Sequence, residues 1–298
     1  MSIFTLGTAQ WGQAYGISNK IGQPDVSEIR NIFRFAAKSR ILTIDTARTY
    51  GLSEEVIGKA LSTSSNFNFR IITKLSPKVY EEGSSKQETI TRVNSSVQES
   101  ICALQLKSLD TLLLHRGFHR SVLNGIIWET LKKLRNDGVI KKIGISAVNP
   151  GEAFEAIEDP SVQVIQVASS LLDQRLIRND FFTKALEINR EVFVRSVYLQ
   201  GIAFLNPKLL PIHLRPLAPT LSQIQTLSSD LKVKPEEIWL HFARTIPSTS
   251  LVLGVESLAQ VMSNFNVMSK PIPAFVQNYS RQIPQFEDAQ LDPSLWKL

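Results

Sequence analysis

The chain has 298 residues, of which 43% are hydrophobic and 20% are charged, and this composition excludes a disordered or membrane-spanning class. The net charge of +6 is diffuse, and the densest basic runs carry no interleaved aromatic residues, so we expect no nucleic-acid partner. The N-terminus shows no secretory signal, no apolar run approaches about 20 residues, and a single cysteine fits a reducing compartment. We therefore expect a cytoplasmic protein with no membrane partner.

Short β-branched segments alternate with longer amphipathic segments along nearly the whole chain, which predicts βα units and a parallel sheet. The predicted strands cover residues 4–9, 41–45, 70–74, 109–114, 142–146, 162–168, 191–196 and 250–253. The predicted helices cover residues 26–38, 53–61, 86–104, 124–137, 150–158, 180–189, 234–246 and 257–266. One (β/α)8 TIM barrel typically takes roughly 250 residues, so we expect one α/β domain that spans residues 1–298.

Two local features of the predicted helices can be tested directly. Ser53 stands before two glutamates and is predicted to cap the helix that they open. Cys102 follows Val93 and Val97 at helical spacing, and we expect it to be a small buried residue rather than a reactive thiol.

Two segments do not fit the simple repeat. Residues 197–232 contain four prolines and are too long for a plain βα connection, so we expect a lid or cofactor-covering loop and an extra helix near 220–231. The tail, residues 267–298, is also rich in proline, and we expect its Trp296 to dock on the protein. Both segments are expected at the C-terminal face of the barrel, where they would shape the substrate pocket.

Polar residues stand at or just past the ends of three successive predicted strands. Asp45 ends the second strand, and Tyr50 follows five residues later. Lys74 ends the third strand, and His115 follows the fourth. A parallel barrel gathers its catalytic groups at this end of its strands. Each residue alone has an ordinary explanation as a cap, a turn or a surface group, but the ordered set indicates a catalytic site.

The pattern Asp-x4-Tyr-Gly, followed by Ser-Glu-Glu, a strand ending in Lys and a strand ending in His, resembles the aldo-keto reductase superfamily. The resemblance covers almost the whole chain and implies NAD(P)(H)-dependent, reversible reduction of an aldehyde or ketone to an alcohol. It implies that Tyr50 is the general acid and base, that the Lys74 ammonium stabilises the phenolate, and that Asp45 keeps Lys74 charged. His115 would orient the substrate carbonyl and stabilise its developing negative charge.

The resemblance also implies a cofactor site at the ends of several strands and in the last βα unit. The cofactor-binding residues that it implies are Gly7, Thr8, Asp45, Ser146, Gln166, Arg195, Ser196, Gly254, Glu256, Gln260 and Asn264. Ala147 stands where the family has a carboxamide-binding asparagine, and Asn149 is either its substitute or the start of a helix. Arg195 stands where many members have an aromatic ring, and its planar guanidinium can also stack. Trp11, Tyr50 and His115 are expected in the substrate pocket.

Glu256 bears on the choice between NAD(H) and NADP(H). The family often has arginine at this point, and a carboxylate there would repel a 2′-phosphate and accept hydrogen bonds from a free ribose hydroxyl. The family as a whole favours NADP(H), so Glu256 shifts the expectation only slightly towards NAD(H). The alternative is that Glu256 is a solvated first-turn residue favoured by the helix dipole.

The sequence defines the substrate and the assembly state less closely than it defines the fold and the site residues. The segment from Gly7 to Asn19 resembles a bacterial subgroup associated with carbohydrate and polysaccharide pathways, which implies a sugar-derived carbonyl as substrate. The alternative function is a cofactor-binding redox-sensing or regulatory subunit with little turnover. The histidines show no metal-binding spacing, so no metal is expected, and both a monomer and a homo-oligomer remain open.

Overall fold

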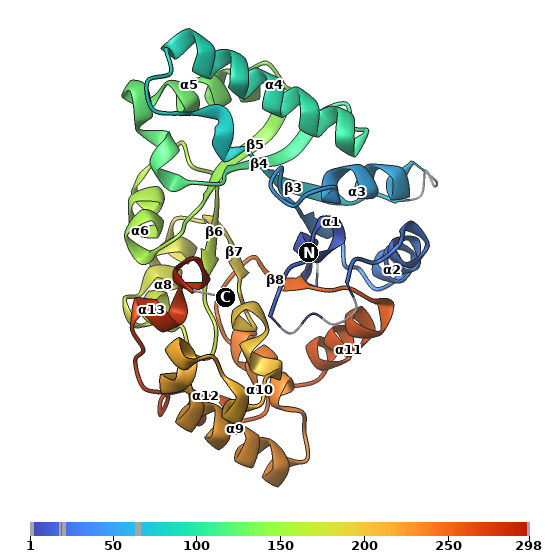
Figure 1. Ribbon diagram of the computed structural model, residues 1–298, viewed down its shortest axis with the longest axis vertical. Helices are drawn as coiled ribbons and strands as arrows, with labels where there is room; N and C mark the ends of the chain where they lie inside the picture. The colour runs from blue at the N-terminus through green and yellow to red at the C-terminus, as the bar shows by residue number, and fades with distance from the viewer. Residues whose placement is uncertain (1–2, 18, 20–21, 63–66, 297–298) are drawn as a thin grey trace.

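Eight parallel strands form a closed barrel at the centre of the protein, in the order in which they occur in the chain (Figure 1). The computed structural model describes residues 3–17, 19, 22–62 and 67–296. The strands are β1 (Thr5–Gly7), β2 (Thr43–Asp45), β3 (Arg70–Lys74), β4 (Leu109–Leu114), β5 (Ile140–Ser146), β6 (Val164–Ala168), β7 (Glu191–Arg195) and β8 (Ser250–Gly254). The last strand pairs with the first, with Gly7 beside Gly254, and this pairing closes the barrel. The prediction of a (β/α)8 barrel is confirmed.

Helices surround the barrel and connect its strands (Figure 1). The longer ones are α2 (Val26–Lys38), α3 (Ser53–Leu61), α4 (Lys86–Leu104), α5 (Val122–Asn136), α6 (Pro150–Glu158), α8 (Phe181–Glu187), α9 (Ala218–Leu231), α10 (Pro235–Ala243) and α11 (Leu258–Ser269). The shorter ones are α1 (Ala9–Gly12), α7 (Arg175–Arg178), α12 (Phe275–Ser280) and α13 (Asp288–Leu291). The predicted elements lie within a few residues of the observed ones. The first strand ends at Gly7 rather than at residue 9, because the chain turns into α1 there.

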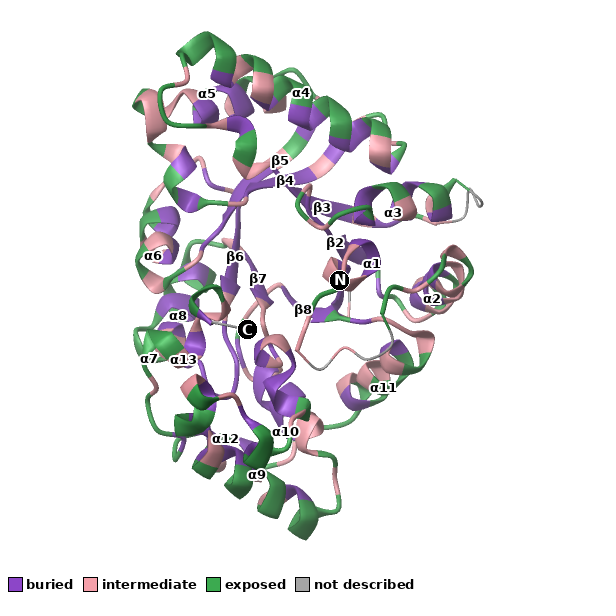
Figure 2. Ribbon diagram, in the orientation of Figure 1, coloured by how far each residue is buried: buried purple, intermediate pink, exposed green. Residues whose placement is uncertain are grey.

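The hydrophobic core has two layers, which Figure 2 shows as purple strands and purple inner faces of the helices. A small cluster of buried side chains forms one layer, and its members are Ile72, Leu113, Val164, Phe193 and Val252. The larger layer packs the helices against the strands and includes residues such as Phe33 and Trp239, both 0% exposed. Because both faces of the strands are buried, the strand ends are held as a rigid frame for the loops.

Two of the predictions about helices are wrong. Helix α3 begins at Ser53 itself, and the buried Ser53 hydroxyl makes no cap, because it turns inward to bind Thr8. Cys102 is exposed on α4, and its sulfur accepts a hydrogen bond from the Gln98 side chain, because helical spacing left it on the outer side of the helix.

The proline-rich segment after β7 has the predicted extra helix, α9. Before this helix the chain forms three short 3-10 helices, namely η3 (Leu199–Phe204), η4 (Pro207–Leu209) and η5 (Ile212–Leu217). The other described 3-10 helices are η1 (Pro77–Val79), η2 (Gly117–Arg120) and η6 (Pro293–Leu295).

The C-terminal tail is anchored on the segment around α7. The Gln174 side chain donates to the Ser280 carbonyl at 3.0 Å, and Arg178 donates to the Ile283 carbonyl at 2.8 Å. Trp296 is 8% exposed, so the expectation that it docks is confirmed. Residues 297 and 298 of the predicted tail, and Ser18 of the segment from Gly7 to Asn19, lie outside the described residues.

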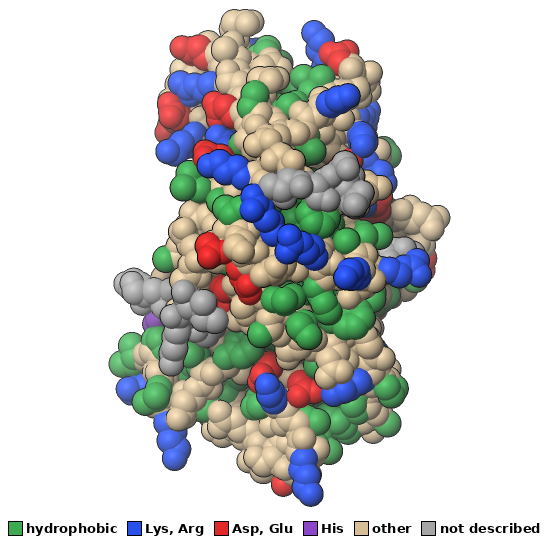
Figure 3. Space-filling view, turned by 90° about the vertical axis from the view of Figure 1, so that its right-hand side faces the viewer, with side chains coloured by type: hydrophobic (Ala, Val, Ile, Leu, Met, Phe, Trp, Pro, Cys, Tyr) green, Lys and Arg blue, Asp and Glu red, His purple; other side chains and the backbone are tan. Residues whose placement is uncertain are grey.

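The charge of the surface and the hydrophobicity of the helices are relevant to the predictions about nucleic-acid and membrane partners. Figure 3 shows basic and acidic side chains interspersed on one face of the molecule, in keeping with a diffuse net charge. Within the described part of the chain, no helix has both the length and the apolar character needed to cross a membrane.

The packing of α3 against α4 supplies a test of the fold. A Cβ on Gly58 would lie 2.2 Å from the Ala103 carbonyl oxygen, so Gly58→Ala forces the two helices apart. We expect this change to lower the free energy of unfolding by at least about 2 kcal/mol, as overpacking does. Chemical denaturation measures the change. Lys59→Ala on the exposed side of the same helix is the control, and we expect a change within about 0.5 kcal/mol. Equal stability of the two variants would contradict the close contact.

Candidate active site

A cavity of about 820 Å³ opens at the C-terminal ends of the strands. Small-molecule and cofactor sites typically have volumes of roughly 300–1,000 Å³, so this cavity is large for such a site. Most of the predicted site residues line it, and these are Gly7, Thr8, Asp45, Tyr50, His115, Ser146, Arg195, Ser196, Gly254, Glu256, Gln260 and Asn264. Three predicted residues, Trp11, Lys74 and Gln166, lie behind its surface.

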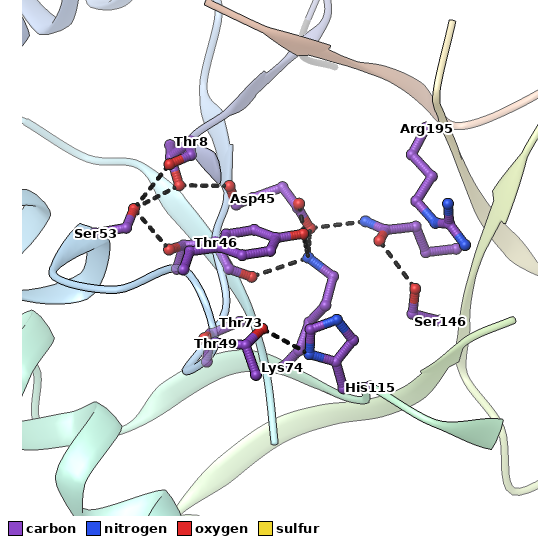
Figure 4. A network of polar contacts seen from close by, with 12 residues as sticks. Thr8, Asp45, Thr46, Thr49, Ser53, Thr73, Lys74, His115, Ser146 and Arg195 are labelled. Carbon is purple, nitrogen blue, oxygen red and sulfur yellow. Dashed lines mark hydrogen bonds and ion pairs between the residues drawn. The ribbon is translucent and has the colours of Figure 1, made fainter. Parts of the chain in front are cut away.

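A buried ion pair forms the floor of the site (Figure 4). The Lys74 ammonium is 2.7 and 2.9 Å from the two carboxylate oxygens of Asp45, and it also donates to the Thr46 carbonyl at 2.9 Å. Lys74 is 1% exposed. Burial alone lowers the pKa of Lys74, but the Asp45 carboxylate and the Tyr50 phenol outweigh burial and raise the pKa above its usual value. Lys74 therefore remains an ammonium at neutral pH.

Tyr50 and His115 face the cavity beside this ion pair. The Lys74 Nζ lies 3.3 Å from the Tyr50 hydroxyl oxygen, within hydrogen-bond distance. The His115 ring lies edge-on to the Tyr50 ring, with 6.1 Å between the ring centres, and its Nδ1 is 3.1 Å from the Thr49 hydroxyl. Burial, and then the positive charges of Lys74 and Arg116, lower the pKa of His115 to about 3. His115 is therefore neutral near pH 7 and can donate one ring N–H to a bound oxygen.

A chain of hydroxyl groups fixes the segment between Asp45 and Tyr50. The Ser53 hydroxyl lies 2.9 Å from the Thr8 hydroxyl and accepts a hydrogen bond from Thr46 at 3.1 Å. The Thr8 hydroxyl donates to the Asp45 carbonyl at 2.9 Å. These residues are buried, so the contacts hold the end of β1 to the loop that carries Tyr50 (Figure 4).

Two glycines allow this loop to lie directly on α1. A Cβ on Gly12 would lie 1.8 Å from the Tyr50 carbonyl oxygen, and a Cβ on Gly51 would lie 2.1 Å from the Gly12 carbonyl oxygen. Gly51 also has a φ of +56°, in the left-handed region that glycine tolerates. The close contact and the positive φ thus explain why glycine follows Tyr50 in the sequence motif.

A buried glutamate behind the site was not predicted from the sequence. Glu54 is 2% exposed, accepts from the Thr73 hydroxyl at 2.6 Å and pairs with Arg48 at 2.7 Å. Arg48 also pairs with Glu99 on α4. The Ser-Glu-Glu segment was the available signal, but its glutamates resembled ordinary first-turn residues of a helix.

The end of the β1–β8 seam is suited to a close approach by a ligand. Gly7 and Gly254 lie side by side, and a Cβ on Gly7 would lie 3.1 Å from the Gly254 nitrogen. The neighbouring Gln10, which was not predicted, lines the cavity, and its buried side-chain oxygen has no partner among the described residues. A bare backbone and an unpaired acceptor at the cavity wall fit a polar, flat group such as a nicotinamide or a ribose.

Ser146 and Gln166 lie together at the ends of β5 and β6. The Ser146 hydroxyl donates to the Gln166 side-chain oxygen at 3.2 Å, and the Gln166 amide donates to Asp45 at 2.7 Å. Gln166 is fully buried, so it orients Asp45 and Ser146 from behind the cavity surface. Asn149 caps α6 through the Glu152 backbone N–H, so the helix-start alternative is confirmed for Asn149.

Arg195 and Ser196 line the cavity at the end of β7. The Arg195 guanidinium donates to the Ala147 carbonyl at 2.9 Å and lies 3.3 Å from the Ser196 hydroxyl. These contacts hold the planar guanidinium against the end of β5, and Figure 4 shows Arg195 and Ser146 on the same side of the site. The arrangement is compatible with stacking on a flat ring.

The β8 unit supplies the far end of the cavity. Gln260 bonds to Glu256 twice, since its amide group donates to the Glu256 carboxylate and its oxygen accepts from the Glu256 backbone N–H at 2.7 Å. Asn264 accepts a hydrogen bond from the Tyr198 hydroxyl at 2.9 Å. The Glu256 carboxylate is therefore held at the cavity wall and is not a free surface group.

Trp11 is the predicted site residue that the structure places elsewhere. Its side chain is 1% exposed, its ring packs on Phe33, and its N–H donates to the Val255 carbonyl at 2.7 Å. The expectation that Trp11 lines the substrate pocket is therefore wrong. The hydrogen bond to Val255 turns the indole away from the cavity and into the packing between the barrel and α2.

Two further segments line the cavity, and the sequence predicted this for the tail but named no pocket residue in either segment. Tyr15 comes from the loop after α1, and its hydroxyl accepts a hydrogen bond from Gln200 of η3 at 3.0 Å. Residues 291–294 of the tail form another part of the wall. No group of three or more His, Cys, Asp or Glu suited to a metal ion occurs among the residues that the structure describes.

Comparisons with known proteins match this chain over nearly its whole length. The family model described as "Aldo/keto reductase family" matches residues 4–283. An uncharacterized oxidoreductase of Mycobacterium tuberculosis is 24% identical over 297 residues, covering 93% of this chain and 85% of the relative.

Solved structures share the fold. A holo-form aldo-keto reductase from Bacillus halodurans superposes with a TM-score of 0.72 at 22% identity, over 96% of this chain and 94% of the other. An aldo/keto reductase from Klebsiella pneumoniae, in complex with NADP and acetate, superposes with a TM-score of 0.69 at 17% identity, over 95% and 92% of the two chains.

The low pKa of His115 predicts a pH-dependent contribution to stability. Between pH values of about 3 and 6.5, an unfolded histidine binds a proton that folded His115 does not, so stability falls as the pH is lowered through this range. We expect His115→Gln to lose this part of the dependence, by up to about 1.4 kcal/mol per pH unit. Denaturation of both proteins between pH 7.5 and 4.5 measures the difference. Parallel stability curves would show that the His115 pKa is not depressed.

Proposed function

Because the chain belongs to the aldo/keto reductase family, whose members are NAD(P)-dependent oxidoreductases, we propose that it reversibly reduces an aldehyde or ketone to an alcohol with Tyr50 as general acid and base. The observation that carries the proposal is the contact between the Tyr50 hydroxyl and the buried Lys74–Asp45 pair. The cavity lies directly over this contact and is bordered by His115.

The side chains of the protein have distinct roles in this proposal. The Tyr50 hydroxyl gives its proton to the carbonyl oxygen in reduction and takes it back in oxidation. The Lys74 ammonium, 3.3 Å away, stabilises the negative charge that is left on the phenol oxygen. Asp45 keeps that ammonium charged, and Gln166 holds Asp45 in place. His115, being neutral, donates a ring N–H to the same carbonyl oxygen and orients it.

The cofactor contributes the hydride when it is bound. The residues suited to hold its nicotinamide end are Gly7, Thr8, Ser146 and Arg195 around the strand ends, and Gln10 offers an unpaired acceptor beside them. Glu256, Gln260 and Asn264 are suited to the adenosine end, near the start of α11. The cavity therefore supports an extended pose across the mouth of the barrel.

Features of the cavity support a polar, sugar-derived substrate. Gln13, Thr49 and Ser294 line the cavity and carry amide or hydroxyl groups that suit hydroxyl-rich ligands. A purely hydrophobic pocket would not select such a ligand. We therefore keep a sugar-derived carbonyl compound as the proposed substrate class.

Tyr50→Phe tests the chemical role of the phenol. We expect the rate of aldehyde reduction to fall by roughly 10²-fold or more, because the proton donor is lost, while the affinity for NADH or NADPH stays within about twofold. Steady-state kinetics and fluorescence titration of the cofactor measure the two effects. Tyr15→Phe removes another phenol of the same cavity and is the matched control, for which we expect a change of only a few fold. Equal activity of Tyr50→Phe and the unaltered protein would refute the assignment.

The same assays separate an enzyme from a redox-sensing subunit. An enzyme turns over generic aldehydes, whereas a sensor retains its cofactor tightly and reduces them barely or not at all. Failure to bind either NADH or NADPH would reject both functions.

Glu256→Arg tests the choice of cofactor. The held carboxylate of Glu256 is expected to repel a 2′-phosphate, so its replacement by arginine should shift the ratio of the two dissociation constants towards NADPH by about tenfold. Titration with NADH and NADPH at one salt concentration gives this ratio. Glu55→Arg, on the exposed side of α3, is the control for added charge. An unchanged ratio in Glu256→Arg would mean that the carboxylate does not face the ribose.

A further inference from the structure

Among the described residues, seven charged side chains line the cavity besides Asp45, and they are Arg116, Arg175, Arg195, Lys234, Glu236, Glu256 and Asp292. Arg116 follows β4, Arg175 begins α7, and Asp292 belongs to the tail. Asp45 and Lys74 at the floor of the cavity neutralise each other.

Arg175 and Asp292 already have hydrogen-bond partners, as do Arg195 and Glu256. Arg175 is bonded to both oxygens of Asp173, at 2.7 and 2.8 Å, and it also pairs with Asp288 of the tail. The Asp292 carboxylate accepts from the backbone N–H and the hydroxyl of Ser294, at 2.9 and 2.7 Å. Arg175 therefore holds the tail to α7, and Asp292 caps a turn within the tail.

The Arg116 side chain is different, because its guanidinium has no hydrogen bond or ion pair with any residue in the described part of the chain, while it is exposed and lines the cavity. Arg116 follows His115 directly in the sequence, and both residues line the cavity. The positive charge reaches the reaction site, since Arg116 is among the groups that lower the pKa of His115, after burial and Lys74.

We propose that Arg116 binds an anionic group of the substrate, so that the preferred substrates are carbonyl compounds that carry a carboxylate or a phosphate. A guanidinium presents paired N–H donors that match two oxygens of either anion, and such charge-assisted bonds are stronger than neutral ones.

This inference rests on the proposed reductase function and narrows its substrate class. Arg116 lies on the substrate side, next to His115, whereas the groups assigned to the adenosine end lie near α11. A change at Arg116 should therefore affect the substrate and leave cofactor affinity unchanged. This separation makes the two proposals testable in one set of measurements.

The test compares charged and neutral aldehydes of similar size. Succinic semialdehyde is paired with butanal for the carboxylate, and glyceraldehyde 3-phosphate with glyceraldehyde for the phosphate. We expect the unaltered protein to prefer at least one charged member over its neutral partner. We expect Arg116→Gln to lower kcat/KM for that member by roughly tenfold, mainly through KM, and to leave the neutral member within about twofold.

Two other variants complete the design. Arg116→Lys keeps the charge and should restore part of the preference, more for phosphate than for carboxylate, because lysine lacks the paired donors. Arg34→Gln removes an exposed arginine of α2, outside the cavity lining, and should change none of the four rates.

The outcomes distinguish the two proposals. Turnover of neutral aldehydes with no preference for the charged ones, or an equal effect of Arg116→Gln on both, would overturn the role of Arg116 and leave the reductase function intact. Absence of any reduction by the unaltered protein, in spite of cofactor binding, would reject the reductase function and this inference with it. A preference for only one of the two anions would identify the anion that Arg116 accepts.

Discussion

The buried pair of Lys74 and Asp45 is the interaction on which the rest of the site depends. A lysine that is 1% exposed stays charged only beside a carboxylate, and removal of one partner from a buried pair commonly costs about 3–5 kcal/mol. The pair is positioned by the parallel pairing of β2 with β3, and Gln166 from the opposite side of the barrel orients the carboxylate. The barrel thus holds an ammonium at a fixed point, and the phenol of Tyr50 is placed against it.

The barrel and the common location of Asp45, Lys74 and His115 were predictable from the sequence because both follow from a simple repeat. The strands are short apolar runs, and a side chain at the end of each run must emerge at the same mouth of a parallel barrel. Asp45, Lys74 and His115 obey this rule, so their common location followed from their order along the chain. The exposure of Cys102 was missed because helical spacing alone does not define which side of a helix a borderline position takes.

Other parts of the site could not be predicted, since they depend on contacts between segments that are distant in the sequence. Trp11 is of a residue type that often lines pockets. A hydrogen bond to Val255, more than 240 positions away in the sequence, instead directs its side chain into the core. Glu54 looked like an ordinary glutamate in the first turn of a helix. It is in fact buried, and it bonds to Thr73 and Arg48. The segments that form the cavity wall at η3 and in the tail show no periodic pattern of hydrophobic residues. Their course depends on how they pack on the barrel and not on the βα repeat.

The attachment of the tail has a consequence for how such a protein diversifies. The tail reaches the cavity after passing over α7, to which it is fastened by Gln174, Arg175 and Arg178. Neither these contacts nor residues 291–294 include Asp45, Tyr50, Lys74 or His115. A change in the length or sequence of the tail therefore reshapes the cavity wall while the contacts among Asp45, Lys74 and Tyr50 stay in place, so these two parts of the structure can diverge independently.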